Sequence, residues 1–174
     1  MVHLWSPWRL AYVTGSSASE RPGCVFCLTP EPGRGANEDL VLVRGPSVYV
    51  VLNLYPYNNG HLMVVPYRHI ATLQASSAEE REELIRFARH AEIALTEAYA
   101  PDGLNVGINL GRPAGAGIVD HLHIHVVPRW NGDTNFMTAI GNTRVLPEDL
   151  AATKRRLQPI FERLAGEDGQ GSRL

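Results

Sequence analysis

The sequence predicts an α+β fold: a single domain with a largely antiparallel five-stranded sheet, one long helix and a C-terminal helix. Two observations support this prediction. Three short strand-like segments, joined by turns rich in Gly, Pro and Asn, precede one long segment of helical periodicity. Two further strand-like segments follow that helix. A run of strands, a helix and a second run of strands is typical of an α+β domain.

The composition indicates one domain and a small substrate. The chain has 174 residues, of which 44% are hydrophobic and 20% are charged, which is enough for one well-packed domain. We expect this domain to span residues 1–165 and residues 166–174 to form a flexible C-terminal tail. A net charge of −2 argues against a broad surface for nucleic acid or membrane, so an anionic partner would bind at a local site.

The sequence contains no segment typical of export or membrane insertion. Residues 1–10 include Trp5, Pro7, Trp8 and Arg9 and lack the apolar core of a signal peptide. No stretch approaches the roughly 18 apolar residues of a membrane-spanning helix. We therefore expect a soluble cytoplasmic protein.

The first three strands are marked by β-branched residues and turn signals. Residues 39–45 and 47–55 are predicted strands, separated by a turn at Gly45 and Pro46. A third strand follows the turn "PYNNG", because residues 62–65 form a continuous apolar run that ends at Pro66.

A helix of about 20 residues is predicted next. Ser77 and Glu80 have the spacing of a capping box, and the segment Pro101–Asp102–Gly103 stops the helix. His90 lies off the apolar stripe and is expected to be solvated. Residues at helical spacing form that stripe: Leu84, Phe87, Ala88, Ala91, Leu95 and Ala98.

Two strands and a second helix complete the fold. Residues 104–111 form the fourth predicted strand, and the loop "RPAGAG" leads into a fifth strand that carries three histidines. The second helix is predicted over residues 147–164, starting at Pro147 and bending at Pro159.

The histidine strand has the period-two pattern of a half-buried strand. His121, His123 and His125 alternate with aliphatic residues, so the three imidazoles are expected to share one face. Side chains two residues apart lie about 6.5 to 7 Å from each other. Three interpretations are open: a polar face that happens to be rich in histidine, a zinc site, or a nucleophilic middle histidine whose neighbours bind an anionic substrate.

The two cysteines, Cys24 and Cys27, stand together in "PGCVFC". They can be a redox pair, two thiols of no consequence, or half of a tetrahedral zinc site. Loop-like composition on both sides disfavours the redox pair, which expects a strand before it and a helix after it. Zinc is favoured, with two further ligands drawn from the histidines at positions 61, 69, 90, 121, 123 and 125.

These motifs together resemble the histidine triad family of nucleotide hydrolases and transferases. The resemblance covers residues 3–145 and rests on "LWSPWRLAYV", "CVFC", "NNGHLMVVPYRHI", "GINLG" and the His-x-His-x-His-x-x pattern at 121–127. The opening and the segment "RWNGDTNFMTAIG" resemble the branch of diadenosine tetraphosphate phosphorylases, or ATP adenylyltransferases. The resemblance implies a homodimer whose two sheets join across the helices, with one nucleotide site, for adenine nucleotides, in each subunit.

The resemblance also implies a mechanism. His123 would attack the α-phosphorus of a nucleotide, and water or phosphate would resolve the nucleotidyl-histidine. A neutral imidazole can act in this way if a hydrogen bond, for example to a backbone carbonyl, fixes its tautomer. His125 and His61 would contact the phosphate, and the loop amides of Gly115, Ala116 and Gly117, with Arg129, would offer a local anion site.

Further residues are implied by the same resemblance. Asn53 would contact the ribose and Asn109 the phosphate, although either amide can instead cap a turn or a strand end. Leu54, with Val50 and Leu52, would line the base pocket or belong to the core. The resemblance to zinc-bearing members of the family implies that this protein has a structural zinc. Its ligands would be Cys24, Cys27, His69 and His121. No organic cofactor is expected.

One departure from the family pattern bears on the reaction. Gly117 and Ile118 stand where many hydrolase members have glutamine followed by serine or threonine, which favours the phosphorylase-like branch. Hydrolysis of a nucleoside phosphoramidate or a dinucleoside polyphosphate is an alternative. Two other hypotheses are open: a zinc hydrolase with the three triad histidines as catalytic ligands, and a nucleotide-binding regulator with weak catalysis.

Overall fold

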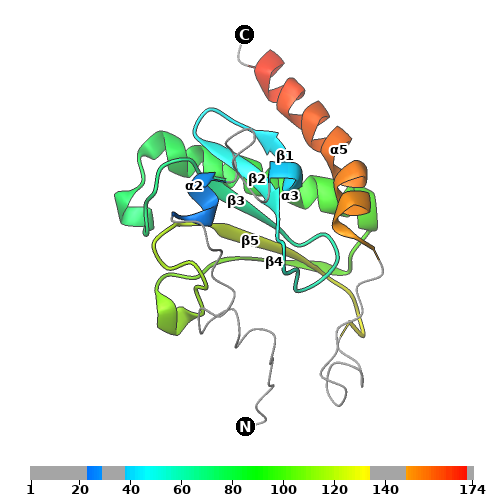
Figure 1. The fold of residues 1–174 in the computed structure, drawn as a ribbon. Coiled ribbons are helices and arrows are strands. Elements are labelled where there is room, and N and C mark those ends of the chain that lie inside the picture. The colour runs from blue at the N-terminus through cyan, green and yellow to red at the C-terminus, as the bar shows by residue number, and fades with distance from the viewer. Residues whose placement is uncertain (1–22, 29–37, 134–147, 172–174) are drawn as a thin grey trace.

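A computed structural model describes residues 23–28, 38–133 and 148–171 (Figure 1). Its centre is a five-stranded sheet of order β1-β2-β3-β5-β4 in which every neighbouring pair is antiparallel. The predicted α+β fold and its antiparallel sheet are therefore confirmed. The strands are β1 (Val41–Arg44), β2 (Val48–Leu52), β3 (Leu62–Pro66), β4 (Gly103–Ile108) and β5 (Ile124–Arg129).

The two faces of the sheet have different roles. One face packs on α3 (Ala78–Tyr99) and α5 (Leu150–Gly171), and it forms the main core. The opposite face holds a smaller cluster under α2 (Val25–Leu28), so α2 and α3 lie on opposite sides (Figure 1). Because side chains alternate along a strand, β2 and β3 divide between these clusters. The second cluster comprises Phe26, Val41, Tyr49, Val51, Met63 and Val65.

The long helix α3 begins and packs as the sequence predicts. The Ser77 side chain accepts from the amide of Glu80, and the Glu80 carboxylate accepts from the amide of Ser77, which is a complete capping box. The helix ends where Ala100 adopts a left-handed conformation with φ of 42°. Its predicted apolar stripe faces the main core.

His90 is a correction to the sequence-based expectation. Its side chain is 1% exposed and not solvated, because α5 covers this part of α3. The Nε2 atom lies 3.1 Å from a carboxylate oxygen of Asp168, and the ring meets the ring of Phe87 edge-on. The contact with Asp168 lacks hydrogen-bond geometry. Burial lowers the pKa of His90, and Asp168 opposes part of this effect.

The C-terminal helix differs from its predicted bounds at both ends. It begins at Leu150, because the side chain of Asp149 caps it by accepting from the amide of Ala152 at 2.7 Å. It continues past the predicted end at position 164 to Gly171, with Pro159 inside it. Pro147 lies outside the described residues. Among the helices that the structure describes, none has the length and the apolar character needed to cross a bilayer.

Candidate functional site

The histidines gather on the face of the sheet that carries the smaller cluster. Met63 of β3 pairs with His125 of β5, which places the segment around His61 beside the triad. The triad strand starts later than predicted, at Ile124, so only His125 lies within it. The chain leaves the sheet before this point because the amide of Leu122 donates to the carbonyl of Ile70 at 2.6 Å. His121 and His123 therefore lie in the segment that leads into the strand.

His123 is buried, and one hydrogen bond defines its tautomer. Its Nδ1 lies 2.8 Å from the backbone carbonyl oxygen of His121. A carbonyl only accepts, so Nδ1 carries the proton and the Nε2 lone pair remains for attack. The side chain is 5% exposed, and burial lowers its pKa, partly offset by the bond to that carbonyl. His123 is therefore a neutral imidazole with its nucleophilic nitrogen defined.

A second pair of histidines forms a directed hydrogen-bond chain. The amide of Tyr57 donates to Nδ1 of His61 at 3.0 Å, so His61 carries its proton on Nε2. That Nε2 donates to Nδ1 of His125 at 3.0 Å, which leaves the proton of a neutral His125 on its own Nε2. Burial, followed by the charges of His125 and His123, lowers the pKa of His61 to about 3. His61 is 1% exposed and contacts the triad through His125.

Asn53 lies at the edge of this chain. Its Oδ1 accepts from the amide of Tyr55 at 3.0 Å, and its Nδ2 lies 3.3 and 3.4 Å from the two ring nitrogens of His61. The turn-capping alternative is thus present in the structure. Leu54 beside it is 42% exposed, while Val50 and Leu52 belong to the main core.

The glycine-rich loop before the triad is held by its own hydrogen bonds. The amide of Gly115 donates to the carbonyl of Arg112 at 3.0 Å, and that of Ala116 donates to the carbonyl of Gly111 at 3.4 Å. Ala116 is buried, whereas Gly117 is exposed. Two of the three amides expected to bind phosphate therefore already have acceptors within the loop.

Asn109 and His123 directly follow and precede the last residue pair of β4 and β5. The last residue pair of β4 and β5 joins Ile108 to Ile124, and Asn109 follows Ile108 by one residue. Its side chain is half-buried. Continuing this antiparallel register by one residue places Asn109 opposite His123, because the two chains run in opposite directions from each pair.

Arg129 does not provide the anion site that the sequence suggested. Its guanidinium binds Asp133 through two nitrogens, at 2.6 and 2.8 Å, and donates to Asn105 at 3.0 Å. Asn58 joins this group by donating to Asp133 at 2.9 Å and to the carbonyl of Pro128 at 3.0 Å. Bidentate pairing satisfies the guanidinium, so Arg129 ties the end of β5 to the loop that follows it and to β4, while Asn58 connects the loop before β3 to the same group.

Two cysteines and two histidines form a compact cluster on the other side of His123. The ligand atoms of Cys24, Cys27, His69 and His121 all lie within 4.8 Å of one another. Three sulfur–nitrogen separations are 3.3, 3.3 and 3.6 Å. A tetrahedral zinc with ordinary bond lengths requires about 3.6 Å between such atoms. The donor set and its spacing therefore fit zinc.

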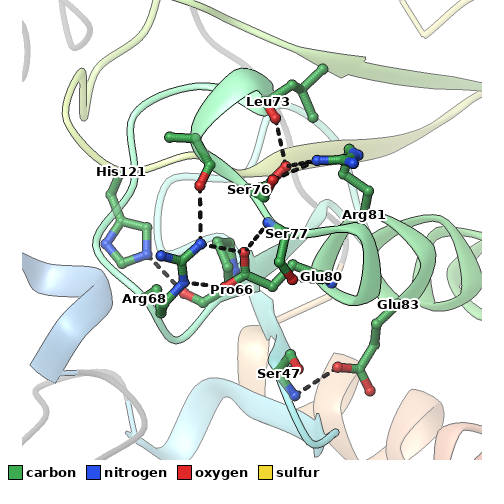
Figure 2. A network of polar contacts seen from close by, with 11 residues as sticks. Ser47, Pro66, Arg68, Leu73, Ser76, Ser77, Glu80, Arg81, Glu83 and His121 are labelled. Carbon is green, nitrogen blue, oxygen red and sulfur yellow. Dashed lines mark hydrogen bonds and ion pairs between the residues drawn. The ribbon is translucent and has the colours of Figure 1, made fainter.

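Neighbouring groups orient the two histidines of this cluster. His121 points Nε2 at the carbonyl of Pro66, 2.8 Å away, so its Nδ1 presents a lone pair to the cysteines (Figure 2). Arg68, next to His69 in the chain, binds both carboxylate oxygens of Glu80 at 2.7 Å (Figure 2). This ion pair ties the loop that carries His69 to the start of α3.

Two aromatic residues near the triad were not predicted from the sequence. Tyr57 places its ring over His61 and His125, with centroid separations of 4.5 and 5.9 Å. Phe26 packs its ring on His121 and His123. The position of Phe26 between Cys24 and Cys27 could have indicated this contact. If the two cysteines bind a metal together with His121, a side chain between them lies close to the triad.

Comparisons with known proteins show which family the chain belongs to. The model of the HIT domain family matches residues 34–132. The chain is 44% identical over 164 residues to a protein of Mycobacterium tuberculosis called AP-4-A phosphorylase, covering 92% of this chain and 84% of that one.

Solved structures are also similar. A Zn-bound histidine triad family protein from Mycobacterium smegmatis superposes with a TM-score of 0.67 at 26% identity, covering 83% of this chain and 97% of that one. A hypothetical histidine triad nucleotide-binding protein from Sulfolobus tokodaii shares the fold, with a TM-score of 0.64 at 24% identity and coverage of 81% and 93%. The resemblance drawn from the motifs is thus confirmed, and the chain belongs to the HIT domain family of histidine triad proteins.

Proposed function

We propose that this protein cleaves dinucleoside polyphosphates by transferring a nucleotidyl group to His123, in the manner of a diadenosine tetraphosphate phosphorylase. The observation that carries the proposal is the bond from Nδ1 of His123 to the carbonyl of His121, which leaves Nε2 as the nucleophile. The relative from Mycobacterium tuberculosis called AP-4-A phosphorylase supports the substrate class. Adenine nucleotides are therefore the substrates to test first.

The transfer proceeds in two balanced steps. Nε2 of His123 attacks the α-phosphorus, forming a phosphorus–nitrogen bond, and the bond to the bridging oxygen breaks as the leaving nucleotide takes the electron pair. The proton stays on Nδ1, so the adduct is an imidazolium whose charge the carbonyl of His121 stabilises. An acceptor oxygen then attacks phosphorus, and the electron pair returns to Nε2. With diadenosine tetraphosphate and phosphate, ATP leaves first and ADP forms second.

Neighbouring residues bind and orient the nucleotide in this proposal. His125 donates from Nε2 to a non-bridging phosphate oxygen. His61 keeps the proton of His125 on Nε2, because it donates to Nδ1 of that ring. His61 is thus a positioning residue, because its own Nε2 is engaged by His125 and its side chain is buried. Asn53 and Leu54 contact the nucleoside. Asn109 approaches the phosphate together with Gly117, since the amides of Gly115 and Ala116 already donate within the loop.

A catalytic zinc held by the three triad histidines is disfavoured by the geometry. Nδ1 of His121 faces the cysteines, and Nδ1 of His125 accepts from His61. Within the described residues, the cluster suited to a metal is the one formed by Cys24, Cys27, His69 and His121. We propose a structural zinc there, because four protein ligands close the tetrahedral shell. Zinc supplies folding energy at such a site and leaves the phosphate chemistry to His123.

The protein is also proposed to act as a homodimer. β4 is an edge strand, and its central Val106 is 55% exposed. A hollow beside it is lined from β4 and from the exposed side of α3, including Leu104 and Thr96. An unpaired strand with an apolar surface is suited to pairing with a second copy. The cytoplasm is the proposed compartment, because a zinc site built on two cysteine thiolates needs those cysteines to stay reduced.

Trapping of the covalent adduct tests the proposed function. Brief incubation with diadenosine tetraphosphate, followed by denaturation and mass spectrometry, should show one adenylyl group on the peptide that contains His123. An enzyme that turns over without any such adduct would contradict the proposal. A protein that binds adenine nucleotides but neither forms the adduct nor turns over would instead be a regulator.

A further inference from the structure

We propose that Phe26 is a positioning residue for His123 and that it couples the zinc-binding turn to the nucleophile. The inference rests on the proposed function of His123 and adds a residue between the two sites. Phe26 lies between Cys24 and Cys27 in the chain, and its ring packs against the rings of His121 and His123. The turn that binds the metal therefore also forms one wall around the reactive imidazole.

The ring of Phe26 contacts two histidines of the triad. Its ring centroid lies 4.9 Å from that of His123, at an interplanar angle of 52°, and 5.5 Å from that of His121, at 76°. Such tilted and edge-on arrangements are the favoured ones for aromatic rings. The side chain is 5% exposed and belongs to the cluster on the site face of the sheet. Phe26 thus touches a proposed metal ligand and the proposed nucleophile together.

The imidazole of His123 needs this support because its hydrogen bond at Nδ1 holds the ring at one atom only and permits rotation about that bond. Phe26 packs against the ring, and His125 meets it edge-on with centroids 4.7 Å apart. These two rings limit the rotation of the nucleophile. Small displacements matter, since a misplacement of about 1 Å at a reacting atom costs roughly 100-fold in rate.

The position of Phe26 depends in turn on what holds α2. This helix has four residues, and so short a helix is unstable by itself. A hydroxyl hydrogen bond from Tyr49 of β2 to the carbonyl of Phe26, at 2.7 Å, anchors its backbone. Cys24 and Cys27, on either side, anchor it at the metal cluster. Occupation of the cluster therefore holds the aromatic ring in place against His123.

Two substitutions and one matched control test this inference. Phe26→Leu keeps an apolar side chain of similar bulk, and Phe26→Ala removes the wall. Phe87→Leu is the control, because Phe87 is equally buried but lies in the core on the opposite face of the sheet. For each protein we would measure bound zinc, the single-turnover rate of adenylyl-histidine formation, KM, and the tautomer of His123 by proton–nitrogen NMR.

We expect Phe26→Leu to slow adenylyl transfer roughly 10-fold and Phe26→Ala roughly 100-fold, with KM changed less than threefold and one zinc retained. The NMR spectrum should show a single Nδ1–H tautomer of His123 in the parent and in Phe87→Leu, and a mixture in Phe26→Ala. Unchanged transfer rates and an unchanged tautomer in both Phe26 variants would overturn the inference. So would a loss of rate that added zinc fully restores, since Phe26 would then serve metal binding alone.

This design separates the inference from the proposed function. If the parent protein forms no adenylyl-histidine, the proposed function fails, while the tautomer of His123 still reports whether Phe26 positions the ring. If the adduct forms in the parent and the Phe26 variants match it in rate and tautomer, the function stands and the inference fails.

Discussion

Nδ1 of His123 lies 2.8 Å from the carbonyl oxygen of His121, and the ring of that same His121 faces Cys24 and Cys27. One residue therefore contacts two proposed sites: its backbone carbonyl orients His123, the proposed nucleophile, and its side chain belongs to the proposed zinc cluster. Mutation of the cluster therefore tests how far the position of His123 depends on it.

Replacement of His123, the proposed nucleophile, should greatly slow the chemical step. We expect His123→Ala to lower turnover of diadenosine tetraphosphate about 1,000-fold or more, with nucleotide affinity within roughly tenfold of the parent. His90→Gln is the control, because His90 is buried between α3 and α5 on the opposite face of the sheet. Steady-state kinetics and nucleotide titration would check both. Comparable activity in the two variants would remove His123 from the proposed role.

His61 should act through the tautomer of His125. We expect His61→Ala to lower kcat roughly 10- to 100-fold, because Nδ1 of His125 loses the donor that lies 3.0 Å away. His61→Gln supplies an amide N–H that can reach the same acceptor, so it should recover part of the loss. Parallel kinetics of the two variants would measure this difference. Equal activity in both would indicate that the hydrogen bond to His125 has no catalytic value.

The low pKa of His61 predicts an acid-sensitive fold. Its pKa of about 3 in the folded protein lies below the value of about 6.5 in an unfolded chain. The unfolded state therefore binds one more proton between these values, and the stability from neutral His61 is present above pH 6.5 and lost as the pH falls.

The size of that effect can be measured by chemical denaturation. The contribution of His61 to the free energy of unfolding should fall by about 1.4 kcal/mol per pH unit between roughly pH 5.5 and 4. The His61→Gln variant should show a correspondingly shallower decline than the parent over this range. Parallel curves for the two proteins would contradict the assignment of a buried, neutral His61.

The metal cluster should hold one zinc per subunit. Elemental analysis should find this zinc in the purified protein, and Cys24→Ser or His69→Ala should lower its affinity about 10-fold or more. Activity should survive mild chelation, since a closed shell offers no catalytic position. His90→Gln again serves as the control. Protein that is folded, active and free of zinc would overturn this proposal, as would anomalous density that places zinc at His123 and His125.

Inorganic phosphate should resolve the adenylyl-histidine in preference to water. Gly117 and Ile118 lack the polar side chains that orient the leaving group in hydrolase-like members, and Ile118 packs against the apolar cluster beside Phe26. Product analysis of diadenosine tetraphosphate cleavage with and without phosphate would decide the acceptor. ATP and ADP formed in a phosphate-dependent reaction are the expected products. Equal rates in both conditions, with AMP in place of ADP, would identify a hydrolase.

The sequence alone determined the fold class and the family. Strand and helix periodicities, the capping box at Ser77 and the turn signals are local properties, so they could be recognised without knowledge of tertiary contacts. The spacing of His121, His123 and His125 identified the triad in the same way. The pair Cys24–Cys27 pointed to a metal, but its partners came from a family resemblance.

Only the tertiary structure decided how those residues divide among different tasks. The amide of Leu122 bonds to Ile70, so the chain turns His121 toward the cysteines while His125 stays in the sheet. Packing of α5 buries His90, and the loop after β5 brings Asp133 to Arg129.

These contacts join residues far apart in the chain or depend on how one element packs on another. Local periodicity specifies which face of an element is apolar, but it does not specify which element covers that face. The contact of Phe26 with His123 is the clearest case. The cysteine turn and the triad are far apart in the chain, since 97 residues separate Cys24 from His121, yet these two residues meet in space.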